Sequence, residues 1–316
     1  MDLSIIIVSY NTHSHLRNCL NSVSKNLKDL KYEIIVVDNN STDREIESFP
    51  VEYPSVKFFL RENNDGFGNG CNYGAKTANG KYLLFLNPDI KLIDNSVKKL
   101  YEYLKNHSDC GIVSGLMVDD KGDVLYGFNE YPSFSWEIYQ FLGYGYERKI
   151  KKLINKKEIR ENHNFETDWF HGAIFMISKS DFEKLGGFNE RYFMYYEDVE
   201  ICYKVKMDIR KKIVCIPSVR VFHHTQSSLA SESNDNIFIF HMHRSKIIFF
   251  RNYFFLKRFI LLAFGVLYAL SRIILLPFWK KYKKREKEKF IQLTRVLKLY
   301  LNPAYVGNSK YEYINR

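Results

Sequence analysis

The segment Lys81-Tyr-Leu-Leu-Phe-Leu-Asn-Pro-Asp89 decides the fold. Its apolar part, 82–86, is short and lacks a helical period, so we predict a buried central strand. Pro88 has no N–H to donate to a neighbouring strand, so the strand ends there and Asp89 lies at its carboxyl end. Ligands of open α/β sheets bind along that edge. Asp89 is therefore a candidate to hold a divalent metal ion that binds phosphate. A polar turn that simply ends a strand is the alternative.

Composition and charge limit the classes of protein to consider. With 316 residues the chain can bury a large core, and its net charge of +11 indicates an anionic partner. No nucleic-acid motif accompanies this charge, so we expect no nucleic acid partner. The five cysteines form no Cys-x-x-Cys pair, which suits a reducing compartment. No basic and then apolar segment opens the chain, so we expect no secretory signal and a cytosolic catalytic part.

Apolar runs of strand length alternate with helical periods along much of the chain. Runs at 3–8, 34–37, 56–60 and 112–117 predict buried strands, and spacings of three or four predict helices from about Ser14 and after Asp94. Two further strands are predicted at 213–216 and 219–222. This alternation predicts an α/β fold with a largely parallel sheet and right-handed connections.

Asp38 also ends a predicted strand, so it lies at the same sheet edge as Asp89. A nucleotide across this edge could contact Asp38 with its base or ribose and, through a metal ion, Asp89 with its diphosphate. The glycine-rich segment 63–74 matches neither Gly-x-Gly-x-x-Gly nor a Walker A motif, which excludes a P-loop NTPase. Its glycines could simply allow close packing of a helix on the sheet.

Four segments together resemble family 2 glycosyltransferases: Ser4-Ile-Ile-Ile-Val-Ser-Tyr-Asn11, Val36-Val-Asp-Asn-Asn-Ser-Thr-Asp43, Asn64-Asp-Gly-Phe-Gly-Asn-Gly70 and Phe85-Leu-Asn-Pro-Asp89. The greatest likeness is to bacterial rhamnosyltransferases that build O-antigen and other surface polysaccharides. The resemblance implies the GT-A fold, a mixed, mostly parallel sheet with flanking helices. It also implies Mg²⁺ or Mn²⁺, since the family's Asp-x-Asp metal motif often appears in this branch as Asn-Pro-Asp. That departure leaves Asp89 as the carboxylate of the motif.

The resemblance also implies a nucleotide-sugar donor held by residues in these segments. The expected donor-binding residues are Ser9, Tyr10, Asn11, Asp38, Asn40, Asp65, Gly66, Phe67, Asn72 and Asn87.

An acid pair, Glu197-Asp198, stands at the amino end of a predicted helix. Its role could be helix capping and dipole complementarity, or general-base catalysis after an aromatic run. The segment 186–198 resembles the family motif Gly-Gly-Phe-x-Glu-x-Phe-Phe-Met-Tyr-x-Glu-Asp, with Tyr192 in place of one Phe, and this resemblance places the catalytic carboxylate on Asp198. We therefore expect Asp198, with Glu197 beside it, to be catalytic.

Acceptor and further metal contacts are expected later in the chain. The aromatic and basic stretch 127–165 could stack an acceptor sugar or serve ordinary packing. Expected acceptor-binding residues are Asp168, Trp169, His171, Gly172 and Tyr196. The family often takes a metal or diphosphate contact from the position of His223-His224, and we favour His223 as the second metal residue.

The C-terminal third contains Phe259 to Trp279, 21 residues with a single charge, Arg272, so a transmembrane helix has to be considered. A span would move the basic segment 280–285 out of the cytosol, against the positive-inside tendency. The arginines at 244, 251, 258 and 272 are separated by multiples of seven and would form a basic stripe on one helix. We expect helices lying in the interface of an anionic membrane. A helix packed on the domain, with its arginines facing water, is the alternative.

These observations predict a GT-A catalytic domain over 1–240, with a nucleotide-sugar half at about 1–118 and an acceptor half at about 119–240, and a basic amphipathic helical region over 241–316. We expect an inverting glycosyltransferase that moves rhamnose from dTDP-rhamnose to a lipid-linked glycan or oligosaccharide. It would be peripheral to the cytoplasmic face of the bacterial inner membrane. Galactofuranosyl or another hexosyl transfer is the rival, and a non-catalytic nucleotide-sugar or glycan-binding scaffold is the alternative of another class.

Overall fold

The structure is a computed structural model that describes residues 1–28, 30–42, 44–125, 127–131, 146–224, 234–278 and 285–302. The chain forms two compact units. The first comprises Met1–Tyr131, Glu147–Glu190 and Glu197–Ser227, and the second comprises Pro132–Tyr146, Arg191–Tyr196 and Ser228–Arg316. The domain boundaries expected from the sequence stay a prediction.

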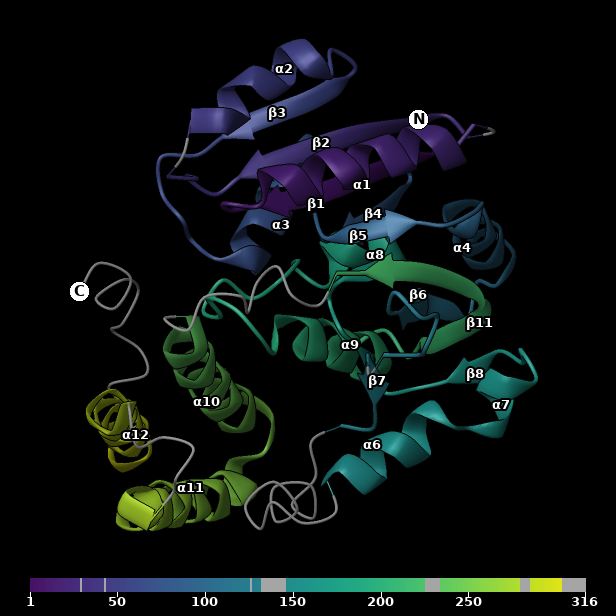
Figure 1. The fold of residues 1–316 in the computed structure, drawn as a ribbon. Coiled ribbons are helices and arrows are strands. Elements are labelled where there is room, and N and C mark those ends of the chain that lie inside the picture. The colour runs from purple at the N-terminus through teal and green to yellow at the C-terminus, as the bar shows by residue number, and fades with distance from the viewer. Residues whose placement is uncertain are drawn as a thin grey trace. The chain divides into compact units, whose positions relative to one another are not determined.

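The first unit is an α/β fold whose elements alternate along the chain (Figure 1). Its strands are β1 (Leu3–Ser9), β2 (Tyr32–Asp38), β3 (Val56–Leu60), β4 (Tyr82–Leu86), β5 (Ile90–Leu92), β6 (Cys110–Val118), β7 (Phe128–Asn129), β8 (Phe165–Glu166), β9 (Trp169–Phe170), β10 (Ile174–Ser178) and β11 (Lys212–His223). Its helices are α1 (His13–Asn26), η1 (Arg44–Ser48), α2 (Phe49–Glu52), α3 (Phe67–Thr77), α4 (Ser96–Asn106), α6 (Tyr146–Ile154), α7 (Lys157–Arg160), α8 (Lys179–Lys184) and α9 (Glu197–Met207). The predicted central strand, 82–86, is confirmed as β4.

The main sheet has the order β3-β2-β1-β4-β10-β6-β11-β5, with β8 paired to β11. The four strands β3, β2, β1 and β4 are parallel, as expected. β10 pairs antiparallel with both β4 and β6, so β6 runs in the same direction as β4, and β11 pairs parallel with β6. Since β5 and β8 pair antiparallel with β11, only β10, β5 and β8 are reversed, and the expected mixed, mostly parallel sheet is confirmed. The strands predicted at 213–216 and 219–222 are one strand, β11, with a register shift between Ile216 and Arg220.

Helices cover both faces of this sheet because its inner strands are apolar on both sides. In β1, Leu3, Ile5 and Ile7 pack in one apolar cluster with residues of α1 and α4, whereas Ile6 and Val8 pack in another with residues of α3, α8 and α9. This alternation follows from the two-residue period of a strand. Because β1, β2 and β4 run parallel, the loops after them leave the sheet at the same edge, its carboxyl edge. Ligands bind at that edge in such folds.

The second unit contains α10 (Asn234–Tyr253), α11 (Phe255–Leu275), η2 (Leu276–Phe278) and α12 (Glu286–Leu301). The expectation of one continuous arginine stripe is wrong, because the chain leaves helical geometry at Phe254 (φ −136°, ψ 65°), between Arg251 and Arg258. Arg244 is also buried, with 4% of its surface exposed, and donates to the carbonyl oxygen of Arg191.

One helical stretch of this unit, Leu256–Phe278, is 23 residues long, and its most apolar 18-residue window has a mean hydropathy of 2.4, enough by length and composition alone to cross a membrane. Only 22% of its most apolar window is buried. The apolar side chains that it exposes include Leu256, Phe259, Leu267, Ile274 and Phe278. Gly265 faces the other way within the unit, since a Cβ there would collide with the ring of Tyr300 on α12.

Candidate active site

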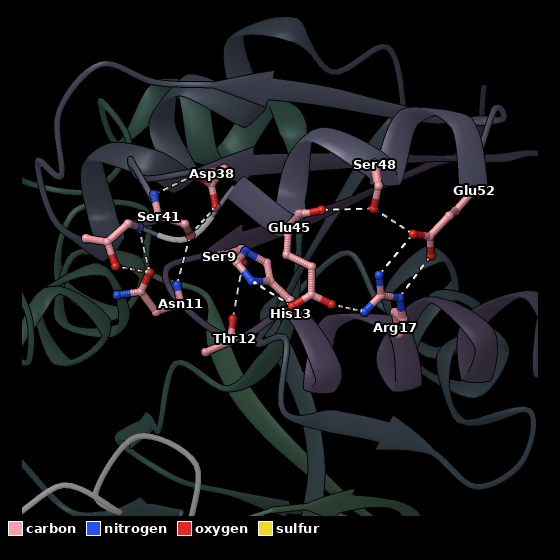
Figure 2. Close-up of polar contacts among 11 residues, drawn as sticks. Ser9, Asn11, Thr12, His13, Arg17, Asp38, Ser41, Glu45, Ser48 and Glu52 are labelled. Atoms are coloured by element: carbon pink, nitrogen blue, oxygen red, sulfur yellow. Dashed lines mark hydrogen bonds and ion pairs between the residues drawn. The ribbon is translucent and has the colours of Figure 1, made fainter.

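The loops after β1 and β2 are joined by hydrogen bonds around Asp38 (Figure 2). Asp38 accepts from the Ser41 N–H at 2.8 Å and from the Ser41 hydroxyl at 2.6 Å. Ser41 Oγ in turn accepts from the Asn11 N–H at 2.9 Å, and Asn11 Oδ1 accepts from the Thr42 N–H at 2.8 Å. Asn11 and Asn40 both adopt positive φ, 54° and 64°, which asparagine tolerates better than most residues. The network holds two of the loops that were expected to bind the donor.

The remaining residues expected in this region differ in exposure. Ser9 is fully buried and shares a hydrogen bond with Thr12, whereas Tyr10 has 37% of its surface exposed. Asp65 forms an ion pair with Arg61 at 2.8 Å. These positions stay candidates for nucleotide contacts.

The glycine-rich segment forms the start of α3, which begins at Phe67. Gly66 has φ 91°, which glycine adopts without strain, and its carbonyl oxygen accepts from the Asn39 side chain. Asn72 is a packing residue in the structure: its amide donates to Phe188 O at 2.8 Å, and its Oδ1 accepts from the Phe188 N–H at 2.9 Å. It thereby ties α3 to the turn after Gly187.

Asp89 and His223 lie together although they are 134 positions apart in the chain. His223 Nε2 is 3.5 Å from Asp89 Oδ2, and 9% of the Asp89 side chain is exposed. The pairing of β11 with β5 places His223 opposite Ile90, directly after Asp89. Asn87 Oδ1, two residues before Asp89, is buried and has no hydrogen-bond partner among the described residues.

These donors fit a divalent metal ion. One carboxylate oxygen and one imidazole nitrogen suit Mn²⁺ or Mg²⁺, and two protein ligands leave most coordination positions for phosphate oxygens and water. Within the described part of the chain, no group of three or more His, Cys, Asp and Glu side chains could hold a metal by itself. Such an ion would therefore depend on oxygens from a bound ligand.

The sequence reasoning missed His15 on α1. Its ring centroid is 5.6 Å from that of His224, and the His224 N–H donates to the carbonyl oxygen of Asp89 at 3.1 Å. The Nδ1 of His15 is buried with no hydrogen-bond partner in the described residues. Its position on the first turn after the β1 loop was the available signal, because that turn lies at the carboxyl edge of the sheet.

Asp198 is buried at the amino end of α9, as predicted for the acid pair, and only 8% of its surface is exposed. Its Oδ2 accepts from the Gly172 N–H at 2.8 Å and its Oδ1 from the Val199 N–H at 2.8 Å. Burial raises the pKa of Asp198, and the charge of His171 and these two N–H donors lower it in part. The carboxylate is thus held in place and is more basic than one in water.

Glu197 and His171 surround this carboxylate. Burial, followed by repulsion from Asp198, raises the pKa of Glu197 well above its ordinary value. Burial lowers the pKa of His171, while the charges of Asp198 and Asp89 oppose that effect. His171 therefore lies within electrostatic reach of both the candidate base and the candidate metal residues. Its ring is 6.3 Å from that of His223.

The structure brings some of the expected acceptor residues to the base and leaves others elsewhere. A Cβ at Gly172 would lie 3.4 Å from Asp198 Cβ and 3.5 Å from the Phe67 ring, so these three residues are neighbours. Asp168 instead forms an ion pair with Lys206 at 2.6 Å, and the Trp169 indole donates to Glu130 O. Tyr196 belongs to the second unit and packs on Phe249. Residues 132–145 of the aromatic and basic stretch 127–165 lie outside the described residues.

Comparison with known proteins gives relatives at modest identity, and three of them are described here. The chain is 29% identical over 212 residues to the low-salt glycan biosynthesis hexosyltransferase Agl10 of Haloferax volcanii, which covers 66% of this chain and 62% of that relative. It is 25% identical to an N-acetylglucosaminyl-diphospho-decaprenol L-rhamnosyltransferase of Mycobacterium tuberculosis, and this alignment covers 76% of this chain and 81% of the relative. It is 26% identical to the rhamnosyltransferase WbbL of Escherichia coli, and this alignment covers 72% of this chain and 87% of the relative.

Comparison with solved structures confirms a fold of the GT-A type. GalNAc-T7, crystallised with UDP, GalNAc and Mn²⁺, superposes with a TM-score of 0.54 at 22% identity, over 71% of this chain and 44% of that one. At this identity the likeness establishes the fold alone. The family model for glycosyl transferase family 2 matches residues 4–186, more than half of the chain. Together with the geometry of the acid pair and the sheet edge, this match shows that the chain belongs to glycosyl transferase family 2.

Proposed function

We propose that this protein is an inverting glycosyltransferase that moves rhamnose from dTDP-rhamnose to a lipid-linked glycan of a surface polysaccharide. Two relatives whose names specify rhamnosyl transfer support this choice of sugar, and one of these names a diphospho-decaprenol acceptor. The observation that carries the proposal is Asp198, a buried carboxylate that accepts hydrogen bonds from the N–H groups of Gly172 and Val199. The ring of His171, the residue before Gly172, is 6.3 Å from that of His223 beside Asp89.

In the proposed reaction, Asp198 removes the proton from an acceptor hydroxyl. The oxygen forms a bond to the anomeric carbon of the donor as the bond to the diphosphate breaks, and the diphosphate leaves with the electron pair. A single displacement of this kind inverts the anomeric centre. The raised pKa of Asp198 suits a general base, because a more basic carboxylate accepts the hydroxyl proton more readily.

The residues Asp89 and His223 would hold a divalent cation, Mg²⁺ or Mn²⁺. When bound, such an ion neutralises the charge of the leaving diphosphate. The Asp38–Ser41–Asn11 network keeps the neighbouring loops in place for the nucleoside. Tyr10, exposed beside this network, is available to stack on the base.

Transfer of another hexose is the second candidate, and the hexosyltransferase relative from Haloferax volcanii favours it. The nucleotide and the acceptor would then differ, whereas the role of Asp198 would not. We further propose that the protein is peripheral to the cytoplasmic face of the bacterial inner membrane. The exposed apolar side chains of α11 and a lipid-linked acceptor support this location.

A donor panel tests the function. Purified protein is mixed with individual nucleotide sugars, Mn²⁺ and a synthetic polyprenyl-diphosphate-linked acceptor, and release of nucleoside diphosphate is measured. We expect dTDP-rhamnose to give the highest kcat/KM, and Asp198→Asn to lower kcat at least about 100-fold while it still binds dTDP. In the wild type, kcat should fall as pH drops through the pKa of Asp198, which lies above the ordinary 3.8, because the base must be ionised.

Asp109→Asn is the control for a lost carboxylate, since Asp109 is exposed and pairs with Lys212. It should keep wild-type turnover. Turnover by Asp198→Asn near the wild-type value would remove Asp198 from the mechanism, and a clear preference for another sugar would replace rhamnose as the donor.

A further inference from the structure

The segment Arg191–Tyr196, which belongs to the second unit, has an unusual backbone. Tyr195 and Tyr196 are consecutive, and both have positive φ, 66° and 68°. Residues with a Cβ rarely adopt this conformation, and for an aromatic residue it is strained. Such strain persists only where the surrounding structure holds the backbone in place.

Two side chains of α10 hold this backbone directly. Ser245 Oγ donates to the carbonyl oxygen of Met194 at 2.8 Å, and an Arg244 guanidinium nitrogen donates to the carbonyl oxygen of Arg191 at 3.0 Å. Ser245 is fully buried and Arg244 is 4% exposed. Burial of a serine and an arginine is costly unless they are hydrogen-bonded, so these contacts account for both residues being inside the unit.

Aromatic rings of the same helix pack on the same segment. Tyr195 packs edge-on against Phe238, with ring centroids 4.8 Å apart, and Phe193 stacks on His241 at 4.7 Å. Tyr196 packs on Phe249 at 5.6 Å. The α10 residues in these contacts are spaced by three or four and so lie on one face of the helix, which packs on the 191–196 segment. They are residues 238, 241, 245 and 249.

The peptide bond after Tyr196 leads into α9, whose first residues are Glu197 and Asp198. We infer that α10 is a positioning element for the catalytic carboxylate, with Ser245 and Arg244 as positioning residues. They hold the strained 191–196 backbone, which the peptide bond between Tyr196 and Glu197 joins directly to the first turn of α9. The inference rests on the proposed function in taking Asp198 as the base. It gives the C-terminal helices a part in catalysis beyond any anchoring.

Ser245→Ala tests the inference with a small change that should leave the fold intact. Ser271→Ala is the matched control, because Ser271 Oγ also donates to a backbone carbonyl, that of Tyr268, on α11 of the same unit. We expect Ser245→Ala to lower kcat about 10-fold to 100-fold, with the KM for dTDP-rhamnose and the Kd for dTDP within about twofold of wild type. Ser271→Ala should leave all three unchanged.

Hydrogen exchange measured by mass spectrometry supplies a readout without turnover. Peptides covering 191–199 should exchange faster in Ser245→Ala than in wild type or Ser271→Ala. Tyr195→Gly removes the strain at one position, since glycine adopts positive φ freely. The factor by which Ser245→Ala lowers kcat should therefore be smaller in the Tyr195→Gly background.

Equal exchange over 191–199 in Ser245→Ala and Ser271→Ala would overturn the inference. A kcat of Ser245→Ala equal to that of an active wild type would also overturn it. Loss of nucleotide binding together with kcat would also overturn it, since that result indicates general unfolding of the site. If the wild type turns over no donor, the proposed function fails separately, and the exchange experiment still decides whether α10 holds the segment.

Discussion

Glu33 offers a test of how the sheet is held together at the edge opposite the active site. Its side chain is buried in β2, 7% exposed, and accepts hydrogen bonds from three residues. Ser4 Oγ and the Asn79 N–H donate to Oε1, each at 2.6 Å, and Lys57 Nζ donates to Oε2 at 2.7 Å. Burial raises the pKa of Glu33, but these donors outweigh it, and the net effect lowers the pKa from 4.5 to about 2.

The size of the effect follows from that pKa. A carboxyl whose pKa falls from 4.5 to about 2 contributes roughly 3 kcal/mol to the free energy of unfolding at pH 7. Lys57 is half exposed, so water screens part of its charge, and we expect about 2 kcal/mol for Glu33→Gln. Because the folded pKa is the lower one, this stability is fully present above pH 4.5 and is lost as pH falls toward 2. The difference between wild type and Glu33→Gln should thus shrink by about 1 kcal/mol from pH 7 to pH 4.

The measurement has to report on the first unit alone, because the chain contains two compact units. Pulsed hydrogen exchange in increasing urea, read on peptides from β1 and β2, does so. Glu52→Gln is the control: its pKa is also lowered to about 2, but its ion pair with Arg17 is in solvent, so it should change stability little. A Glu33→Gln variant as stable as wild type at pH 7, or a difference equal at both pH values, would refute the reasoning.

Two further predictions concern the metal residues and the membrane. Asp89→Ala should weaken binding of dTDP in the presence of Mn²⁺ at least about tenfold by calorimetry, and should make binding insensitive to EDTA; unchanged affinity in both tests would contradict a metal role. Replacing Leu267 and Ile274, which are 54% and 66% exposed, with Asn should lower binding to vesicles of anionic phospholipid by about 100-fold or more in flotation. Leu60→Asn, at an exposed leucine of β3, should not change it, and equal binding by all three proteins would exclude α11 as the membrane contact.

Local sequence was sufficient for much of the catalytic unit. The run 82–86 is a strand because it is apolar and short, and Pro88 ends it, so Asp89 follows the strand as predicted. The acid pair stands at the first turn of α9 because the apolar positions after it have a helical period. These features depend on residues within about ten positions of one another, so the composition and spacing of the local sequence were sufficient to predict them.

Sequence patterns did not reveal which distant segments meet. β10 is inserted antiparallel between β4 and β6, so the parallel direction is interrupted by one reversed strand that the sequence pattern did not indicate. The long-range pairing of β11 with β5 brings His223 to Asp89, and the N–H of Gly172, next to His171, reaches Asp198. A strand has the same alternation whatever its partner, so its neighbours and direction are decided by packing across the whole core.

The C-terminal helices show the same division. Spacing by sevens suggested one continuous arginine stripe, but the helix breaks at Phe254, and Arg244 is buried against the segment before the acid pair. The sequence by itself determined that this region is helical, apolar and basic. Only the tertiary structure decided that one face of α10 is committed to a strained backbone about fifty residues earlier, because a period specifies a face but not the surface that it meets.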